Sequence, residues 1–277
     1  MALFGVSVAS SAEITCLPLG EYPCHSIEIR GRIESGDLSK LEAILQARPP
    51  AEVDKVYVAS PGGSVVEALA IGNLIRARLL DTEAPFRLGG KWRHGIARGT
   101  EVCTTAEGCR CASACALIWF GGINRSGDVG LHRPFREDKQ FQSTSPQQAS
   151  DEYRRALDAM VSYLGKMEVP SRVVDALIST GSNDILWVSD YGTWTEEEGG
   201  YSLYRAPSLS EWFKASCGAL SRPELLEKLN LKGNYYDRVI TAAGQARLTA
   251  LEKAEEKIYD CEGRLLRSAR KTLNWAR

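Results

Sequence analysis

The chain has 277 residues, 44% of them hydrophobic, which is enough to bury the core of an α/β domain with an appendage. Its 34 basic and 35 acidic side chains give a net charge of −1, so the charge does not favour a nucleic acid as partner. No apolar run approaches the roughly 20 residues that a membrane-spanning helix needs, and we therefore expect no membrane span.

The N-terminus has the composition of an export signal. Residues 2–9 form a short apolar run, and Ser10-Ser11-Ala12 before Glu13 is typical of a cleavage site, although the usual positively charged start is missing. We expect a signal-like and N-terminal segment over residues 1–25, and a mature protein that is periplasmic or secreted.

Strand-like and helix-like segments alternate from residue 26 onwards. In chain order they cover residues 26–33 (strand), 37–47 (helix), 53–59 (strand) and 65–80 (helix). This alternation is typical of a β/α spiral. Residues 85–111 are expected to be rich in strands, and residues 148–167 to form a helix.

A glycine turn, Ser60-Pro61-Gly62-Gly63-Ser64, joins the second strand to the second helix. Pro61 restricts its own φ, and consecutive glycines allow positive φ and a close approach of a bound group to the backbone. Amide N–H groups that point outwards from such a turn are suitable donors to a developing oxyanion. An ordinary strand-to-helix connection is the alternative interpretation.

Ser113 stands at the head of the apolar run 114–120, where we expect a buried helix. Small alanines on both sides leave room for a substrate to reach the hydroxyl, and a helix start favours a developing negative charge. The alternative is that Ser113 only caps the helix. His132 is the best placed of the three histidines to serve as a base, because neutral imidazole can take the proton of a serine hydroxyl.

These segments together resemble the ClpP-like serine peptidases of the ClpP/crotonase superfamily. Ser60-Pro61-Gly62-Gly63 is similar to the oxyanion loop of that family, Ala112-Ser113-Ala114 to its nucleophile segment, and Leu131-His132-Arg133-Pro134 to its histidine motif. The resemblance implies Ser113 as nucleophile and His132 as general base. The amides of Gly62 and Ala114 would form the oxyanion hole.

The resemblance also implies the fold and the partners. We expect a ClpP/crotonase-like β/α spiral over residues 26–206, with a helical C-terminal extension over residues 207–277. The activity would be that of a serine hydrolase acting on a peptide or protein, without a cofactor or metal. A homo-oligomer is compatible with this class.

The third member of the triad is less well defined. The family takes an aspartate from a segment after its long helix, and the comparable stretch here is 182–190. Asp184 is our choice, with the role of accepting the second ring N–H of His132. Asp190 is the competing residue, and an Asx turn after Gly181 is the alternative interpretation of Asp184.

Eight cysteines in local groups indicate an oxidising compartment. The groups are Cys16 with Cys24, Cys103 with Cys109, Cys111 with Cys115, and Cys217 with Cys261. An even count in tight clusters favours disulfides over a metal, although a zinc site from the four cysteines between 103 and 115 stays open.

The C-terminal extension contains a capped helix start at Ser221-Arg222-Pro223-Glu224 and a long charged helix over residues 245–275. This helix could pack locally or act as an arm for oligomerisation or partner docking. For the whole chain, a catalytically silent scaffold that binds a peptide or protein is the alternative to the hydrolase. A crotonase-like acyl-CoA enzyme is a third hypothesis, but such enzymes do not need a Ser-His pair.

Overall fold

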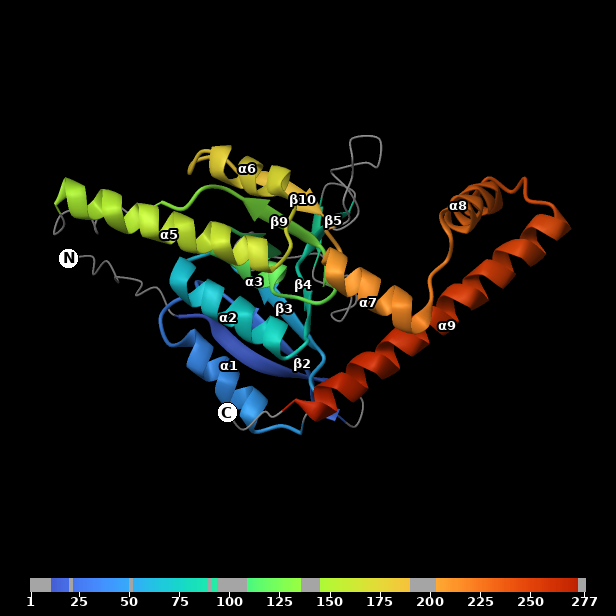
Figure 1. Cartoon of the computed structure of the whole chain (residues 1–277), viewed down its shortest axis with the longest axis horizontal. Helices are drawn as coiled ribbons and strands as arrows, with labels where there is room; N and C mark the ends of the chain where they lie inside the picture. The colour runs from blue at the N-terminus through green and yellow to red at the C-terminus, as the bar shows by residue number, and fades with distance from the viewer. Residues whose placement is uncertain are drawn as a thin grey trace, which may run out of the picture. The chain divides into compact units, whose positions relative to one another are not determined.

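The computed structural model describes seven parts of the chain, residues 11–19, 22–49, 52–88, 91–93, 109–135, 145–189 and 203–273. These residues form a mixed α/β protein, and the expected α/β class is confirmed at that level. The chain divides into two compact units, residues 1–206 with 273–277, and residues 207–272. Figure 1 shows their elements. Whether the three segments expected from the sequence are separate domains stays a prediction.

The first unit is built on a five-stranded sheet of order β1-β2-β3-β4-β8. Its strands are β1 (Glu13–Leu19), β2 (Tyr22–Arg30), β3 (Lys55–Ala59), β4 (Asp81–Glu83) and β8 (Arg125–Ser126). All neighbours are parallel except β1 and β2, as the strand-helix alternation of the sequence requires. In β3 the side chains of Val56 and Val58 are buried in the core, while Lys55 and Tyr57 are only half-buried.

Strand β1 lies inside the N-terminal segment of residues 1–25, after the expected cleavage site before Glu13. It pairs with β2 in antiparallel register from Glu13↔Arg30 onwards, and the Cys16–Cys24 disulfide joins the two strands. Residues 13–19 and 22–25 are therefore part of the sheet, because the ladder and the disulfide both hold them there. Residues 1–10, which contain the expected signal sequence, lie outside the described residues.

A second sheet has three strands in the order β10-β9-β7. They are β7 (Cys111–Ala112), β9 (Asp128–Leu131) and β10 (Leu186–Ser189). A bridge between Ser60 and Cys111 connects the end of β3 to the start of β7. A short antiparallel hairpin is formed by β5 (Phe86–Leu88) and β6 (Lys91–Arg93).

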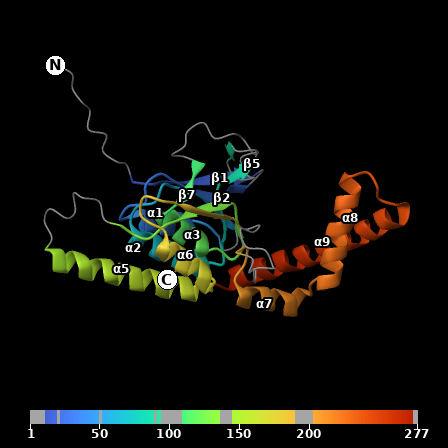
Figure 2. The same cartoon turned by 90° about the horizontal axis from the view of Figure 1, so that it is seen from above.

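Each helix that the sequence predicts in this unit is present, and its ends lie within a few residues of the predicted ones. They are α1 (Asp37–Gln46), α2 (Val65–Ala77), α3 (Ala114–Phe120), α5 (Pro146–Lys166) and α6 (Ser171–Ser179). Helix α6 was not among the expected elements. Figure 2 shows α5 and α6 on one side of strands β1 and β2.

Helix α3 lies at the centre of the core, and each of its seven residues is buried. Its C-terminal carbonyl groups are buried with it and need donors. Arg76 donates to the carbonyl oxygens of residues 120–122, and the hydroxyl of Tyr163 donates to that of Leu117 at 2.7 Å. Arg125, which is 1% exposed, also donates into this end of the helix. Burial lowers the pKa of Arg125 to about 9, at which the guanidinium is still a cation near neutral pH.

The second unit consists of α7 (Pro207–Cys217), α8 (Arg222–Tyr236) and α9 (Ala242–Thr272). The expected helix start at Ser221 is present as a capping box with Glu224. The Cys217–Cys261 disulfide joins α7 to α9. Within the described ranges, no helix combines the length and the apolar character that a membrane crossing requires.

Candidate functional site

A cavity of about 610 Å³ in the first unit brings together segments that are distant in the sequence. Ser113 and His132 both line it, and so do residues 61 and 63–65 of the glycine turn. The other lining residues come from the stretch 32–35 after β2, from 134–135 after β9 and from the approach to β10. The structure therefore puts the expected nucleophile, the expected base and the glycine turn on one cavity.

Ser113 occupies the junction between β7 and α3. Its φ of 59° and ψ of −127° lie in a region that residues other than glycine rarely adopt. The N–H of Ser113 donates to the carbonyl of Gly130 at 2.9 Å, and the N–H of Ala112 donates to that of Ser60 at 3.0 Å. The residue is at the N-cap position, but its side chain makes no capping hydrogen bond. The hydroxyl is thus not used by the helix, and a strained strand-to-helix turn is how the α/β-hydrolases present their nucleophilic serine.

His132 follows the last residue of β9 and is 9% exposed. Its Nδ1 atom lies 2.8 Å from the carbonyl oxygen of Arg133. The N–H of Arg133 donates to Thr180 at the end of α6, which ties this stretch to that helix. A carbonyl oxygen can only accept, so the contact requires the proton to be on Nδ1. In the neutral ring, Nε2 then carries the lone pair that a general base needs.

Asp184 does not come together with His132. Its neighbours Ser182, Asn183 and Ile185 line the cavity, but Asp184 itself is exposed and does not. Its N–H donates to the carbonyl of Gly181 at 3.1 Å, and no hydrogen bond joins it to His132 within the described residues. The competing residue, Asp190, lies outside the described residues. The contact that we expected from a carboxylate is made in this structure by the main-chain oxygen of Arg133.

The glycine turn offers a different donor from the one that we selected. The N–H of Gly62 donates to Ser60 Oγ at 3.0 Å, and that hydroxyl donates to the carbonyl of Gly62 at 3.2 Å. Gly63 lines the cavity and Gly62 does not. Among the hydrogen bonds of the described residues, none uses the N–H of Gly63 or of Ala114. The serine two positions before Gly62 was the sequence signal for this, because serine hydroxyls bond to nearby backbone amides in turns.

Few charges border the cavity. Arg32 and Glu34 face each other across 3.8 Å between Nε and Oε1, and both side chains are partly exposed. The ring of Phe135 lies 5.6 Å from the ring of His132. The remaining lining residues are uncharged, and apolar Val65 and Ile185 are among them. The cavity can therefore accept an uncharged chain segment beside Ser113.

Three disulfides join pairs of cysteines among the described residues. The structure joins Cys16 to Cys24, Cys111 to Cys115 and Cys217 to Cys261, the same pairs that the sequence groups. Cys109 is also disulfide-bonded, and Cys103 lies outside the described residues. The alternative of a zinc site is corrected by this finding, because sulfurs joined in a disulfide are not thiolate ligands. These disulfides are compatible with an extracytoplasmic protein.

Comparison with known proteins yields a distant likeness. No known family and no curated protein matches the sequence. Among solved structures, a mutant of ClpP1 from Listeria monocytogenes is similar at a TM-score of 0.40 and 14% identity, over 67% of this chain and 94% of that chain. The likeness is too distant to support an activity.

Proposed function

We propose that the chain is a ClpP-like serine hydrolase that uses Ser113 as nucleophile and His132 as general base. The observation that carries the proposal is that both residues line one cavity together with the glycine turn. The strained backbone of Ser113 supports it, because such strain persists where the surrounding structure over-determines a conformation and is concentrated at functional sites.

The chemistry would be that of acyl transfer. Ser113 Oγ attacks the carbonyl carbon of the substrate while Nε2 of His132 takes the hydroxyl proton. The carbonyl oxygen of Arg133 holds the N–H of Nδ1 and so keeps the ring in the required tautomer. The protonated ring then gives its proton to the leaving group, and water releases the acyl group in a second round.

The negative charge on the substrate oxygen needs donors. The N–H groups of Gly63 and Ala114 are the best suited, because neither donates elsewhere in the described structure. Gly63 lines the same cavity as Ser113, and Ala114 directly follows Ser113 in the chain. Gly62, which the resemblance implied, would have to release Ser60 Oγ before it could donate.

The substrate class that we propose is a peptide or protein in an oxidising compartment. The largely uncharged lining of the cavity suits an extended peptide segment, since it offers few charged partners for a small anionic substrate. The disulfides support folding outside a reducing cytosol.

A fluorophosphonate probe tests the proposal. The wild-type protein should become labelled, with the adduct on the tryptic peptide that contains Ser113, and Ser113→Ala should not be labelled. His132→Ala should lower the labelling rate by about 10⁴-fold. The matched control is Ser179→Ala, which removes an exposed helix hydroxyl outside the cavity and should label like the wild type. Equal labelling of folded wild type and Ser113→Ala would falsify the proposal, and a folded wild type without any label would favour a silent peptide-binding scaffold.

A further inference from the structure

We infer that the Cys111–Cys115 disulfide is a positioning element for Ser113, so that the site reacts much faster in the oxidised protein than in the reduced one. The inference rests on the proposed function, because it concerns the reactivity of the same serine. The two cysteines are separated by 4 positions, and Ser113 is midway between them.

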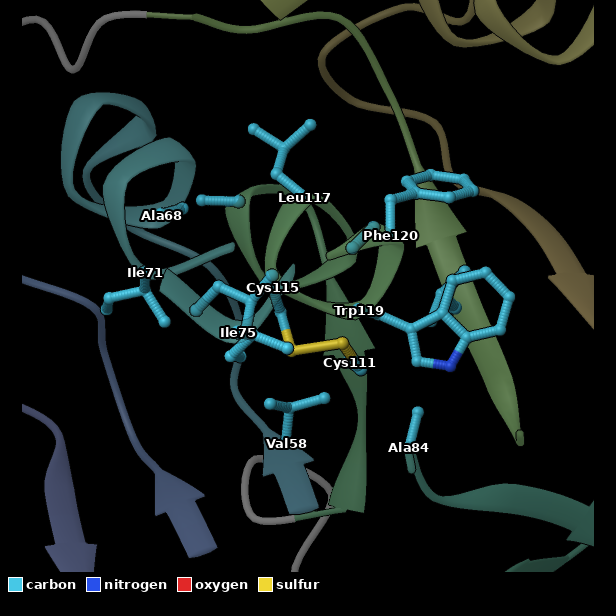
Figure 3. Packing of buried hydrophobic residues seen from close by; sticks show 14 of the residues in the cluster. Val58, Ala68, Ile71, Ile75, Ala84, Cys111, Cys115, Leu117, Trp119 and Phe120 are labelled. Carbon is cyan, nitrogen blue, oxygen red and sulfur yellow. A yellow bond between two sulfur atoms is a disulfide. The ribbon is translucent and has the colours of Figure 1, made fainter. Parts of the chain in front are cut away.

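The disulfide links the two elements that meet at the serine. Cys111 belongs to β7, and Cys115 is in the first turn of α3. Both are fully buried, and Figure 3 shows their bond beside Val58 and Ile75. A covalent link between the strand and the helix start leaves the intervening backbone little freedom to relax.

The backbone hydrogen bonds next to Ser113 mainly hold the end of β7, which precedes it. The amides of Ala112 and Ser113 are bonded to Ser60 and Gly130, which belong to neighbouring strands or their ends. On the helix side, the N–H of Ala116 donates to the carbonyl of Ser113 itself, and this bond does not anchor the helix to the sheet.

Side-chain hydrogen bonds tie α3 to the five-stranded sheet near its C-terminal end, where Thr82 Oγ1 donates to the carbonyl of Trp119 and Trp119 Nε1 donates to that of Ser126. At the N-terminal end the disulfide links the helix to β7, and it therefore opposes relaxation of the positive φ of Ser113.

The Cys16–Cys24 disulfide provides a contrast within the same unit. It joins two strands that already share an antiparallel ladder, and neither cysteine lines the cavity. Its loss should cost stability without moving Ser113. It is therefore the matched control for the loss of Cys111–Cys115.

The redox step balances as a thiol-disulfide exchange. Two thiols, those of Cys111 and Cys115, lose two protons and two electrons, and an oxidant of the disulfide class, such as oxidised glutathione, is reduced to two thiols. The chain would thus react slowly while it is reduced and faster after the bond forms. Because the bond is fully buried, it should form during folding and resist reductant afterwards.

The experiment compares Cys111→Ala/Cys115→Ala with Cys16→Ala/Cys24→Ala and the wild type, each in the full chain. The fluorophosphonate labelling rate is measured well below the unfolding temperature of each protein, and amide hydrogen exchange is followed over residues 110–120. We expect the first variant to label about 10²-fold more slowly, the loss typical of a misplaced catalytic group. Its exchange should accelerate around Ser113, while the control variant should label like the wild type.

The outcomes separate this inference from the proposed function. If the wild type labels and Cys111→Ala/Cys115→Ala labels as fast, the positioning role is overturned and the hydrolase proposal stands. If the wild type does not label, both are overturned. Slow labelling of both cysteine variants would also overturn the inference, because the effect would then be one of general stability.

A second measurement covers the case in which the alanine variant does not fold. Wild-type protein is refolded from the fully reduced state with either reduced or oxidised glutathione, and its free thiols are counted by mass spectrometry. Labelling that is about 10²-fold faster with the Cys111–Cys115 bond than without it supports the inference. Equally fast labelling of folded protein that lacks this bond contradicts it.

Discussion

Gly62 lies against Ser113 so closely that a Cβ atom on the glycine would be 2.6 Å from the Cβ of the serine. The same atom would be 3.0 Å from Ser113 Oγ. Gly62 follows a strand of the five-stranded sheet and Ser113 follows a strand of the three-stranded sheet, and the two residues are in direct contact. An approach this close needs a residue without a side chain at position 62.

Gly62→Ala should destabilise the protein and slow the labelling of Ser113. The substitution places a methyl group on the serine and also forces a side chain on a φ of 109°, a strain of about 1–3 kcal/mol. Gly36→Ala is the control, because Gly36 has a φ of 101° but no atom within 4 Å of the added Cβ. Urea unfolding and fluorophosphonate labelling of both variants measure the difference. Equal labelling of the two would mean that the contact with Ser113 has no role in reactivity.

Asp184→Asn should keep the labelling rate of the wild type. The carbonyl oxygen of Arg133 already accepts from Nδ1 of His132, and Asp184 is exposed and outside the cavity lining. The labelling rate is compared across a pH series with that of Asp175→Asn, which alters an exposed carboxylate on α6. A loss by several orders of magnitude in Asp184→Asn alone would return the carboxylate to the triad that the sequence predicts.

Asp128→Asn should stabilise the protein modestly near neutral pH. Burial raises the pKa of Asp128, although the N–H of Arg87, which donates to Oδ2 at 2.7 Å, opposes the shift. A carboxyl group whose pKa is raised on folding contributes most to stability below its unfolded pKa, and this contribution is lost as the pH rises through the folded pKa. Asparagine does not titrate, and its carbonyl oxygen can still accept from Arg87.

The advantage of Asp128→Asn over the wild type should therefore shrink as the pH falls. Urea unfolding at about pH 7 and about pH 4 measures the two differences in unfolding free energy. Asp175→Asn serves as the exposed control. A difference between Asp128→Asn and the wild type that is the same at both pH values would contradict the prediction.

Cys217→Ser/Cys261→Ser should destabilise the second unit without changing the labelling of Ser113. The disulfide closes a separation of 44 residues, and loop entropy assigns such a bond about 4 kcal/mol. All residues that line the cavity belong to the first unit. Thermal unfolding followed by circular dichroism, together with the labelling rate, checks both parts. Unchanged unfolding would show that the three helices do not depend on the bond.

Local features were readable in the sequence because short-range chemistry produces them. The capping box at Ser221 follows from a hydroxyl and a carboxylate at fixed spacing, and the strand-turn-helix around Gly62 follows from glycine and proline geometry. Cysteines that are close in the sequence, such as Cys111 and Cys115, can reach each other without depending on how the rest of the chain folds. These predictions needed no knowledge of the remaining chain.

Strand β1 shows what local patterns do not reveal. No strand is expected from the sequence over residues 13–19, and their place in the sheet is decided by pairing with β2. An edge strand is stabilised by its ladder and by one face of the sheet, and its own residues carry only a weak signal.

The sequence by itself determined the turn, the helix caps, the candidate nucleophile and the candidate base, because residue type and spacing set local backbone geometry and proton chemistry. Only the tertiary structure decided that Ser113 and His132 share a cavity, that Arg133 rather than Asp184 contacts the ring, and that Ser60 occupies the amide of Gly62. The physical reason is that these contacts join segments whose distance depends on how sheets and helices pack. Packing sums many weak interactions along the whole chain, and no single stretch of sequence contains that sum.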